Sequence, residues 1–233
     1  MRTTDLSKTL DHTVLAPETT RADVVRACAR AHDVHVAAVC VTPAYVPDAV
    51  ACLRGTDVKT CVMVNDAGSA ALRRQIAIVE RAVCQGVDEI DLAMNLAALR
   101  SGAFGIARQE LWRLVYAVRT RAANDARGAV AVKAIVGVPL LDEARVRMAC
   151  KIVSDVGADF AVAWTGARTP MVAGDVELMR DALPETIGVT AAGGVDGLAH
   201  LHEMVSAGAT RIGISDAVEV LEHVRATTNR STQ

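Results

Sequence analysis

The sequence has few aromatic residues, few lysines and almost no net charge. Its 233 residues include only two Trp, two Tyr and two Phe, and 25 Lys plus Arg face 27 Asp plus Glu, for a formal net charge of −2. Proteins that bind nucleic acids usually carry basic patches, and those that bind single strands add aromatic side chains that stack on bases. We therefore expect a small-molecule substrate and neither nucleic acid nor a membrane surface as a partner.

Long apolar runs and closely spaced cysteines are also missing. Hydrophobic residues make up 52% of the chain, yet no stretch approaches the roughly 20 apolar residues that a membrane-spanning helix needs. The N-terminal sequence MRTTDLSKTLDHTV lacks the apolar segment of a signal peptide, which predicts a cytoplasmic protein. The six Cys residues form no CxxC pair, so we expect no metal site and no cofactor.

Short segments rich in Val and Ile alternate with segments of helical period along the whole chain. The predicted strands are Lys8–His12, Val36–Val41, Lys59–Val64, Glu89–Met94, Val130–Val136, Phe160–Trp164, Gly188–Ala191 and Arg211–Ser215. The predicted helices are Arg21–His32, Val46–Leu53, Ala70–Gln85, Ala107–Arg127, Glu143–Val156, Asp175–Ala182, Gly197–Ala207 and Ala217–Thr227. Strict alternation makes the strands parallel and predicts a single-domain (β/α)8 TIM barrel over about residues 6–227, with a tail at 228–233. An open doubly wound sheet is the alternative.

Charged residues interrupt strands that are otherwise apolar. Asp91 and Lys133 lie in the predicted fourth and fifth strands, and Asp11 and His12 end the first. Buried charges need a partner, so Asp91 and Lys133 predict either a structural ion pair between neighbouring strands or a carboxylate and an amine that move protons or form an imine. His12 is a candidate acid or base, although an isolated histidine beside a strand is more often structural.

The ends of the last two strands are a candidate anion site. Gly193, Gly194 and Ser215 lie where TIM barrels often bind phosphate through backbone N–H groups. Asp216 argues against phosphate, because a carboxylate about 4 Å from a phosphate charge costs about 4 kcal/mol at an effective dielectric constant near 20. A cation such as Arg168 could offset this cost. A phosphate ester is therefore not the expected ligand.

Five parts of the sequence resemble the deoxyribose-phosphate aldolases, in order, from about Leu6 to Val218. They are Leu10–Pro17, Ala38–Pro43, Gly86–Asn95, Gly157–Phe160 with Thr165-Gly166, and Ala191–Gly194 with Gly208–Gly213. The resemblance implies a (β/α)8 barrel and class I aldolase ancestry. In that family a lysine on the sixth strand forms a Schiff base with acetaldehyde, a lysine at the end of the seventh lowers its pKa, and an aspartate on the fourth takes part in proton transfer. A homodimer would be ordinary for such a protein.

The sequence departs from this family pattern at both lysines. The resemblance places Val162 at the Schiff-base position and Thr190 at the position of the second lysine, and valine cannot form an imine. The further departures are Ala16, Asn65-Asp66, Trp164 and Ser215-Asp216, which replace a lysine, an apolar turn, a small polar residue and the Ser-Ser phosphate grip. The residues that match the pattern are Asp11, Cys40, Asp91, Asn95 and Lys133.

These observations predict a divergent, aldolase-like enzyme that acts on an unphosphorylated carbonyl substrate by aldol-type or related acid/base chemistry. Lys133 would be a relocated Schiff-base amine or a general acid, with Asp91 as its proton partner. The alternatives are a non-covalent cyclase, dehydratase or isomerase, and a catalytically silent barrel that binds a metabolite. Cleavage of deoxyribose 5-phosphate is not expected. The candidate catalytic residues are Asp91, Lys133, Asp11 and His12. The candidate substrate-binding residues are Cys40, Asp66, Asn95, Val162, Trp164, Thr165, Arg168, Thr190, Gly193, Gly194, Ser215 and Asp216.

Overall fold

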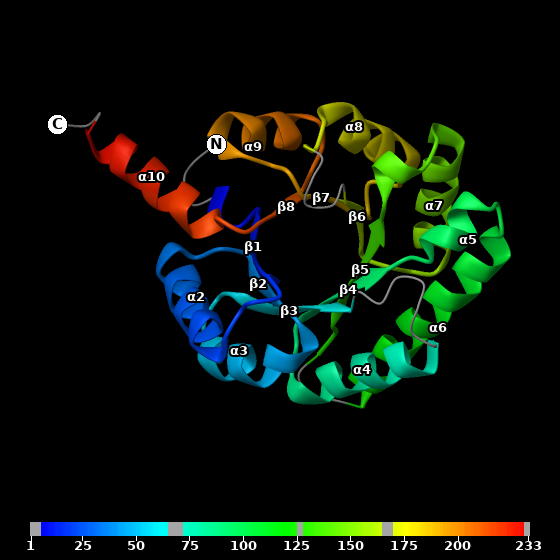
Figure 1. Ribbon diagram of the computed structural model, residues 1–233, viewed down its shortest axis with the longest axis horizontal. Coiled ribbons are helices and arrows are strands. Elements are labelled where there is room, and N and C mark those ends of the chain that lie inside the picture. The colour runs from blue at the N-terminus through cyan, green and yellow to red at the C-terminus, as the bar shows by residue number, and fades with distance from the viewer. Residues whose placement is uncertain (1–5, 65–71, 125–127, 165–169, 231–233) are drawn as a thin grey trace.

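The computed structural model describes residues 6–64, 72–124, 128–164 and 170–230, with side chains as far as residue 226. Figure 1 shows a central ring of strands with helices around its outside. The strands form a closed parallel barrel in the order β1 to β8, because β1 pairs with both β2 and β8. The strands are β1 (Leu10–Val14), β2 (Ala38–Val41), β3 (Lys59–Val64), β4 (Glu89–Ala93), β5 (Ala131–Val136), β6 (Phe160–Trp164), β7 (Gly188–Ala192) and β8 (Arg211–Ile214). The predicted (β/α)8 barrel is confirmed.

Helices follow the strands and cover the barrel. They are α2 (Arg21–Val34), α3 (Val46–Leu53), α4 (Leu72–Gln85), α5 (Leu96–Arg100), α6 (Phe104–Ala123), α7 (Glu143–Asp155), α8 (Ala173–Ala182), α9 (Gly197–Ser206) and α10 (Ala217–Arg230). Two short 3-10 helices, η1 (Pro43–Tyr45) and η2 (Val138–Leu140), follow β2 and β5. Among the described residues, no helix has the length and apolar character that crossing a membrane requires.

The first strand lies two residues later than the sequence predicts. Residues 8 and 9 form a turn instead, in which the backbone N–H of Thr9 donates to the carbonyl of Leu6. The Lys8 amine reaches across the end of the barrel and donates to the carbonyls of Val36 and Asp57. This turn fixes which residues of β1 face the barrel axis.

Alternation along each strand divides the core into two parts. One large cluster, which includes Leu10 and Val39, packs between the strands and the helices. A small cluster of Ala38, Cys40 and Cys61 lies inside the barrel. The side chains that can reach a substrate are therefore those that point into the barrel at the carboxyl ends of the strands.

Candidate functional site

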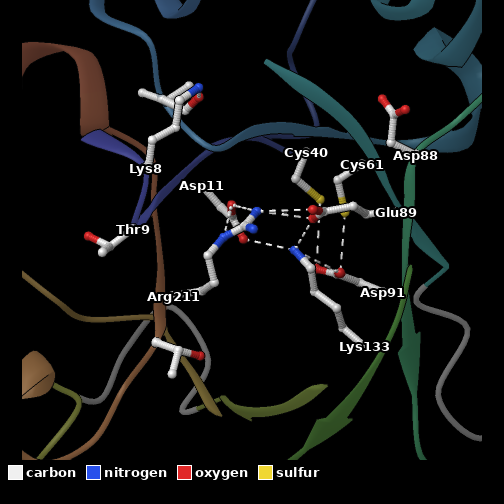
Figure 2. A network of polar contacts seen from close by, with 12 residues as sticks. Lys8, Thr9, Asp11, Cys40, Cys61, Asp88, Glu89, Asp91, Lys133 and Arg211 are labelled. Atoms are coloured by element: carbon white, nitrogen blue, oxygen red, sulfur yellow. Dashed lines mark hydrogen bonds and ion pairs between the residues drawn. The ribbon is translucent and has the colours of Figure 1, made fainter. Parts of the chain in front are cut away.

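Lys133 lies at the centre of a buried ion network inside the barrel (Figure 2). Its side chain is 1% exposed, and its Nζ lies 2.8 Å from Asp11 Oδ2, 2.5 Å from Glu89 Oε2 and 3.7 Å from Asp91 Oδ1. Asp91 and Lys133 are also register partners on β4 and β5, as the two neighbouring strands predicted. The ammonium group of Lys133 is therefore surrounded by three carboxyl groups.

Arg211 completes the network from β8. Its Nε lies 2.9 Å from Asp11 Oδ1, and its Nη2 lies 3.1 Å from Glu89 Oε2. The ring of Phe160 lies below both cations, with its centroid 5.9 Å from Lys133 Nζ and 5.9 Å from Arg211 Cζ. The network thus contains three carboxyl groups and two cations.

The environment of Lys133 keeps its amine protonated. Burial alone lowers the pKa of this amine, but the charges of Asp11 and Asp91 outweigh burial, so the pKa lies well above its usual value. A nucleophilic lysine has to be partly neutral near pH 7. The geometry therefore favours the acid or charge-stabilising role of Lys133 over the imine role.

Asp91 is the carboxyl group whose environment favours the protonated form. Burial raises the pKa of Asp91, and although Lys133 acts in the opposite direction, the pKa lies above its ordinary value. Two thiols donate to this carboxyl, with Cys61 Sγ 3.2 Å from Oδ1 and Cys40 Sγ 3.9 Å from Oδ2. Burial raises the pKa of the Cys61 thiol well above its usual value, so it remains a neutral donor.

A cavity of about 820 Å³ opens at the carboxyl ends of the strands. Its volume is in the range of small-molecule sites. The cavity is lined by Thr13, Leu15, Thr42, Pro43, Met63, Val64, Arg74, Ile78, Trp164, Ala192, Gly193, Gly194, Val195, Gly213, Ile214 and Ser215. Met63, which lines the cavity, is the register partner of Asp91. Asp91 therefore lies next to a lining residue, beneath the lining, of which it is not itself a part. The Asp91 side chain is 12% exposed, whereas that of Lys133 is 1% exposed.

Four of the predicted substrate-binding residues line this cavity: Trp164, Gly193, Gly194 and Ser215. Both glycines have positive φ, 89° and 64°, which a residue with a side chain rarely adopts. The backbone of the β7 end can therefore approach a ligand closely.

Val162 and Thr190 lie one layer deeper. They are register partners on β6 and β7, two residues before Trp164 and Ala192, and they are 2% and 3% exposed. The Oγ1 of Thr190 is buried and has no hydrogen-bond partner among the described residues. Valine and threonine thus occupy the interior positions at which the family resemblance expects lysines.

Three predicted residues lie apart from the cavity. His12 lies on the outer side of β1, where it interacts with Glu219 of α10 and Arg30 of α2. Asn95 caps α5, because its Oδ1 accepts from the N–H of Ala98, and its Nδ2 donates to Glu110 at 2.9 Å. Asp216 follows β8, and the cavity lining does not include it. Asp66, Thr165 and Arg168 lie outside the described residues.

Four residues of the site are missing from the sequence prediction: Glu89, Arg211, Cys61 and Arg74. Glu89 and Arg211 could have been found by parity, because each lies two positions before an inward-facing residue of its own strand. Cys61 has the same parity as Met63. Arg74 lies within the predicted helix Ala70–Gln85, but no motif in the sequence marks it as a residue of the cavity.

Several known proteins with similar sequences are deoxyribose-phosphate aldolases. The chain is 37% identical to the deoxyribose-phosphate aldolase of Clostridium tetani over 221 residues, covering 94% of this chain and 98% of that protein. It is 36% identical to the same enzyme of Aciduliprofundum boonei over 220 residues, covering 94% and 96%. No family model matches the sequence.

Two solved structures share the fold. A deoxyribose phosphate aldolase from Aeropyrum pernix, described as uniquely tetrameric, has a TM-score of 0.86 at 26% identity, with 97% of this chain and 93% of that chain covered. An aldolase called QR15 has a TM-score of 0.85 at 27% identity, with 95% and 96% covered. The similarity in both comparisons extends over nearly the whole barrel.

Proposed function

Since the chain belongs to the deoxyribose-phosphate aldolase family, we propose that it is a divergent member acting on an unphosphorylated carbonyl substrate. Its chemistry is aldol-type or related acid/base catalysis without an imine at the β6 position. Asp91 transfers protons beneath the lining of the cavity, and Lys133 acts as a fixed ammonium group beside it. The substrate is a small molecule.

The observation that carries this proposal is the charge count of the buried network. Among the described residues, the cations that pair with Asp11, Glu89 and Asp91 are Lys133 and Arg211 alone, so one of the three carboxyl groups lacks a compensating cation there. The network is neutral when one of the three carboxyl groups is protonated. Asp91 is that group, because its pKa is raised and its side chain is the most exposed of the three. A carboxyl group that can hold or release a proton near the cavity is a general acid or base.

Two features support an unphosphorylated substrate. The phosphate grip that the family resemblance expects after β8 is Ser215-Asp216 here, so an acidic residue outside the lining follows Ser215, which lines the cavity. The cavity wall is largely apolar, with Leu15, Met63 and Trp164 among its side chains. A doubly charged ester would lose hydration there, with Arg74 as the only cation among the described residues that line the cavity.

Steady-state assays with 2-deoxyribose 5-phosphate, 2-deoxyribose and a panel of unphosphorylated aldehydes and ketones test the proposal. We expect kcat/KM to be highest for an unphosphorylated compound. Asp91→Asn keeps the shape of the side chain but cannot exchange the proton, so kcat should fall by about 10²- to 10⁴-fold. Melting temperature checks that this variant is folded.

The control is Asp181→Asn, which changes an exposed carboxylate on α8 and should leave kcat unchanged. Preferred turnover of 2-deoxyribose 5-phosphate would contradict the proposed substrate class. Full activity of Asp91→Asn would contradict the role of Asp91.

A further inference from the structure

The walls of the large cavity are mostly apolar. Leu15, Met63, Ile78, Trp164 and Val195 all line it. A ligand that fills the cavity gains most of its binding free energy from apolar surface that leaves water. The orientation of the ligand then depends on the few polar groups of the wall, and a charged group contributes most to it.

Arg74 is the only charged side chain among the described residues that line the cavity. It lies in the first turn of α4, four residues before Ile78, so both side chains are on the same face of the helix. Arg74 and Ile78 both line the cavity. The neighbouring Arg73, which is exposed like Arg74, does not line it. The position of Arg74 therefore follows from the helical period of α4.

The guanidinium group of Arg74 has no ion pair or hydrogen bond with any described residue. Arg147 and Arg211, by contrast, are engaged: Arg147 pairs with Glu143 and Asp181, and Arg211 pairs with Asp11 and Glu89. A guanidinium group offers a planar fork of donors that fits a carboxylate with two parallel hydrogen bonds. At the cavity wall this fork is available to a ligand.

The placement of Arg74 is unfavourable for the helix itself. The first turn of α4 contains Arg73 and Arg74 and no acidic residue. Cations near a helix N-terminus interact unfavourably with the helix dipole. A residue that breaks such a local preference often has a functional reason, and a ligand anion at this end of α4 would supply one.

We propose that Arg74 binds the carboxylate of the substrate, whose apolar body lies against Trp164. The substrate class is then a carbonyl compound with one carboxylate group on an apolar body. This inference rests on the proposed function, because it specifies the ligand of the same cavity. Arg74 is a specificity-determining residue on the side of the cavity that α4 forms. It is separate from the Gly193-Gly194 backbone at the end of β7.

Isothermal titration with 3-phenylpropanoate and with 3-phenylpropanamide tests the inference, since the two probes differ only in charge. We expect the carboxylate to bind about 3- to 10-fold more tightly than the amide, which is the contribution of one partly exposed ionic hydrogen bond. Arg74→Gln should abolish this preference. The preference should also shrink in 1 M NaCl, because salt screens an exposed ion pair.

Two variants make the test specific. Arg73→Gln removes an adjacent positive charge outside the cavity and should keep the preference. Trp164→Ala should weaken both probes to a similar extent, because it removes apolar contact and no charge. Equal binding of the two probes by the unchanged protein, or an undiminished preference in Arg74→Gln, would overturn the inference.

The titrations use no turnover, so they separate this inference from the proposed function. If the protein prefers 3-phenylpropanoate through Arg74 but turns over no unphosphorylated carbonyl compound, the proposed function is wrong and the carboxylate site is supported. Tighter Arg74-dependent binding of 2-deoxyribose 5-phosphate than of 3-phenylpropanoate would overturn the carboxylate assignment.

Discussion

At the scale of single residues, the buried charges account for both stability and chemistry. The sequence predicts that Asp91 and Lys133 need partners, because ionised groups in apolar strands are costly. It does not predict that Lys133 is held by three carboxyl groups, since Asp11 comes from β1, far away in the sequence, and Glu89 was not singled out on β4. Only the closed barrel brings these residues together.

Replacing Lys133 by methionine should strongly destabilise the fold. Lys133→Met leaves three buried carboxyl groups with Arg211 as the one remaining cation among the described residues. Breaking a buried ion pair from one side costs about 3–5 kcal/mol. Urea unfolding at pH 7 measures this loss. Lys151→Met on α7 is the control, because its exposed pair with Asp155 contributes less than about 1 kcal/mol. Equal stability of the two variants would show that the network does not hold Lys133 as described.

At the scale of elements, sequence periodicity predicts the strands well and the short helices poorly. The strands Lys59–Val64 and Phe160–Trp164 were predicted with their observed ends. The five-residue helix α5 was not predicted, because it is too short for a periodic pattern and depends on the cap from Asn95. The same cap explains why Asn95 resembles a site residue in sequence and yet lies away from the large cavity.

Gly188 of β7 is the position at which an element depends most on the absence of a side chain. A Cβ there would lie 2.3 Å from the ring of Phe160 and 2.9 Å from Thr210 Oγ1. Gly188→Ala should therefore push Phe160 against Lys133 and Arg211 and destabilise the protein by about 1–3 kcal/mol, measured by urea unfolding.

The control is Gly174→Ala in α8, where a Cβ meets nothing within 4 Å. That substitution should stabilise the protein by up to about 1 kcal/mol, because alanine favours helix. Destabilisation by Gly174→Ala as large as that by Gly188→Ala would contradict the packing described for Phe160.

At the scale of the whole molecule, the barrel interior has two zones. The ion network spans β1, β4, β5 and β8 in the amino-terminal half of the barrel (Figure 2). The cavity occupies the carboxyl-terminal half. Outside the barrel, His12 packs between β1 and the helices α2 and α10. The sequence predicts the barrel and the end of the strands at which a substrate would bind. It does not predict that Asp11 faces the barrel interior and His12 the helices, which depends on the alternation of side chains along β1.

The outward position of His12 predicts a pH dependence of stability. Burial lowers the pKa of His12 below its usual value of 6.5, against the opposing charges of Glu219 and Asp216 and with the aid of Arg30. Below pH 6.5 the unfolded chain therefore binds a proton that the folded chain does not, so stability falls as the pH drops through this window. At higher pH the effect is absent.

His12→Leu should reduce the slope of unfolding free energy against pH between about pH 5 and 6.5, measured by urea unfolding. His202→Leu, at an exposed position of α9, serves as the control and should keep the slope of the unchanged protein. An unchanged slope in His12→Leu would mean that His12 is not buried in its neutral form.

The central claim is carbonyl chemistry without an imine, and borohydride trapping tests it most directly. The protein is mixed with acetaldehyde or with its best unphosphorylated substrate, reduced with sodium borohydride, and measured as intact mass and as peptides. We predict turnover of that substrate and no reduced adduct on Lys133, because the raised pKa of this amine keeps it protonated among three carboxyl groups. A stoichiometric adduct on Lys133 that appears together with loss of activity would contradict the account.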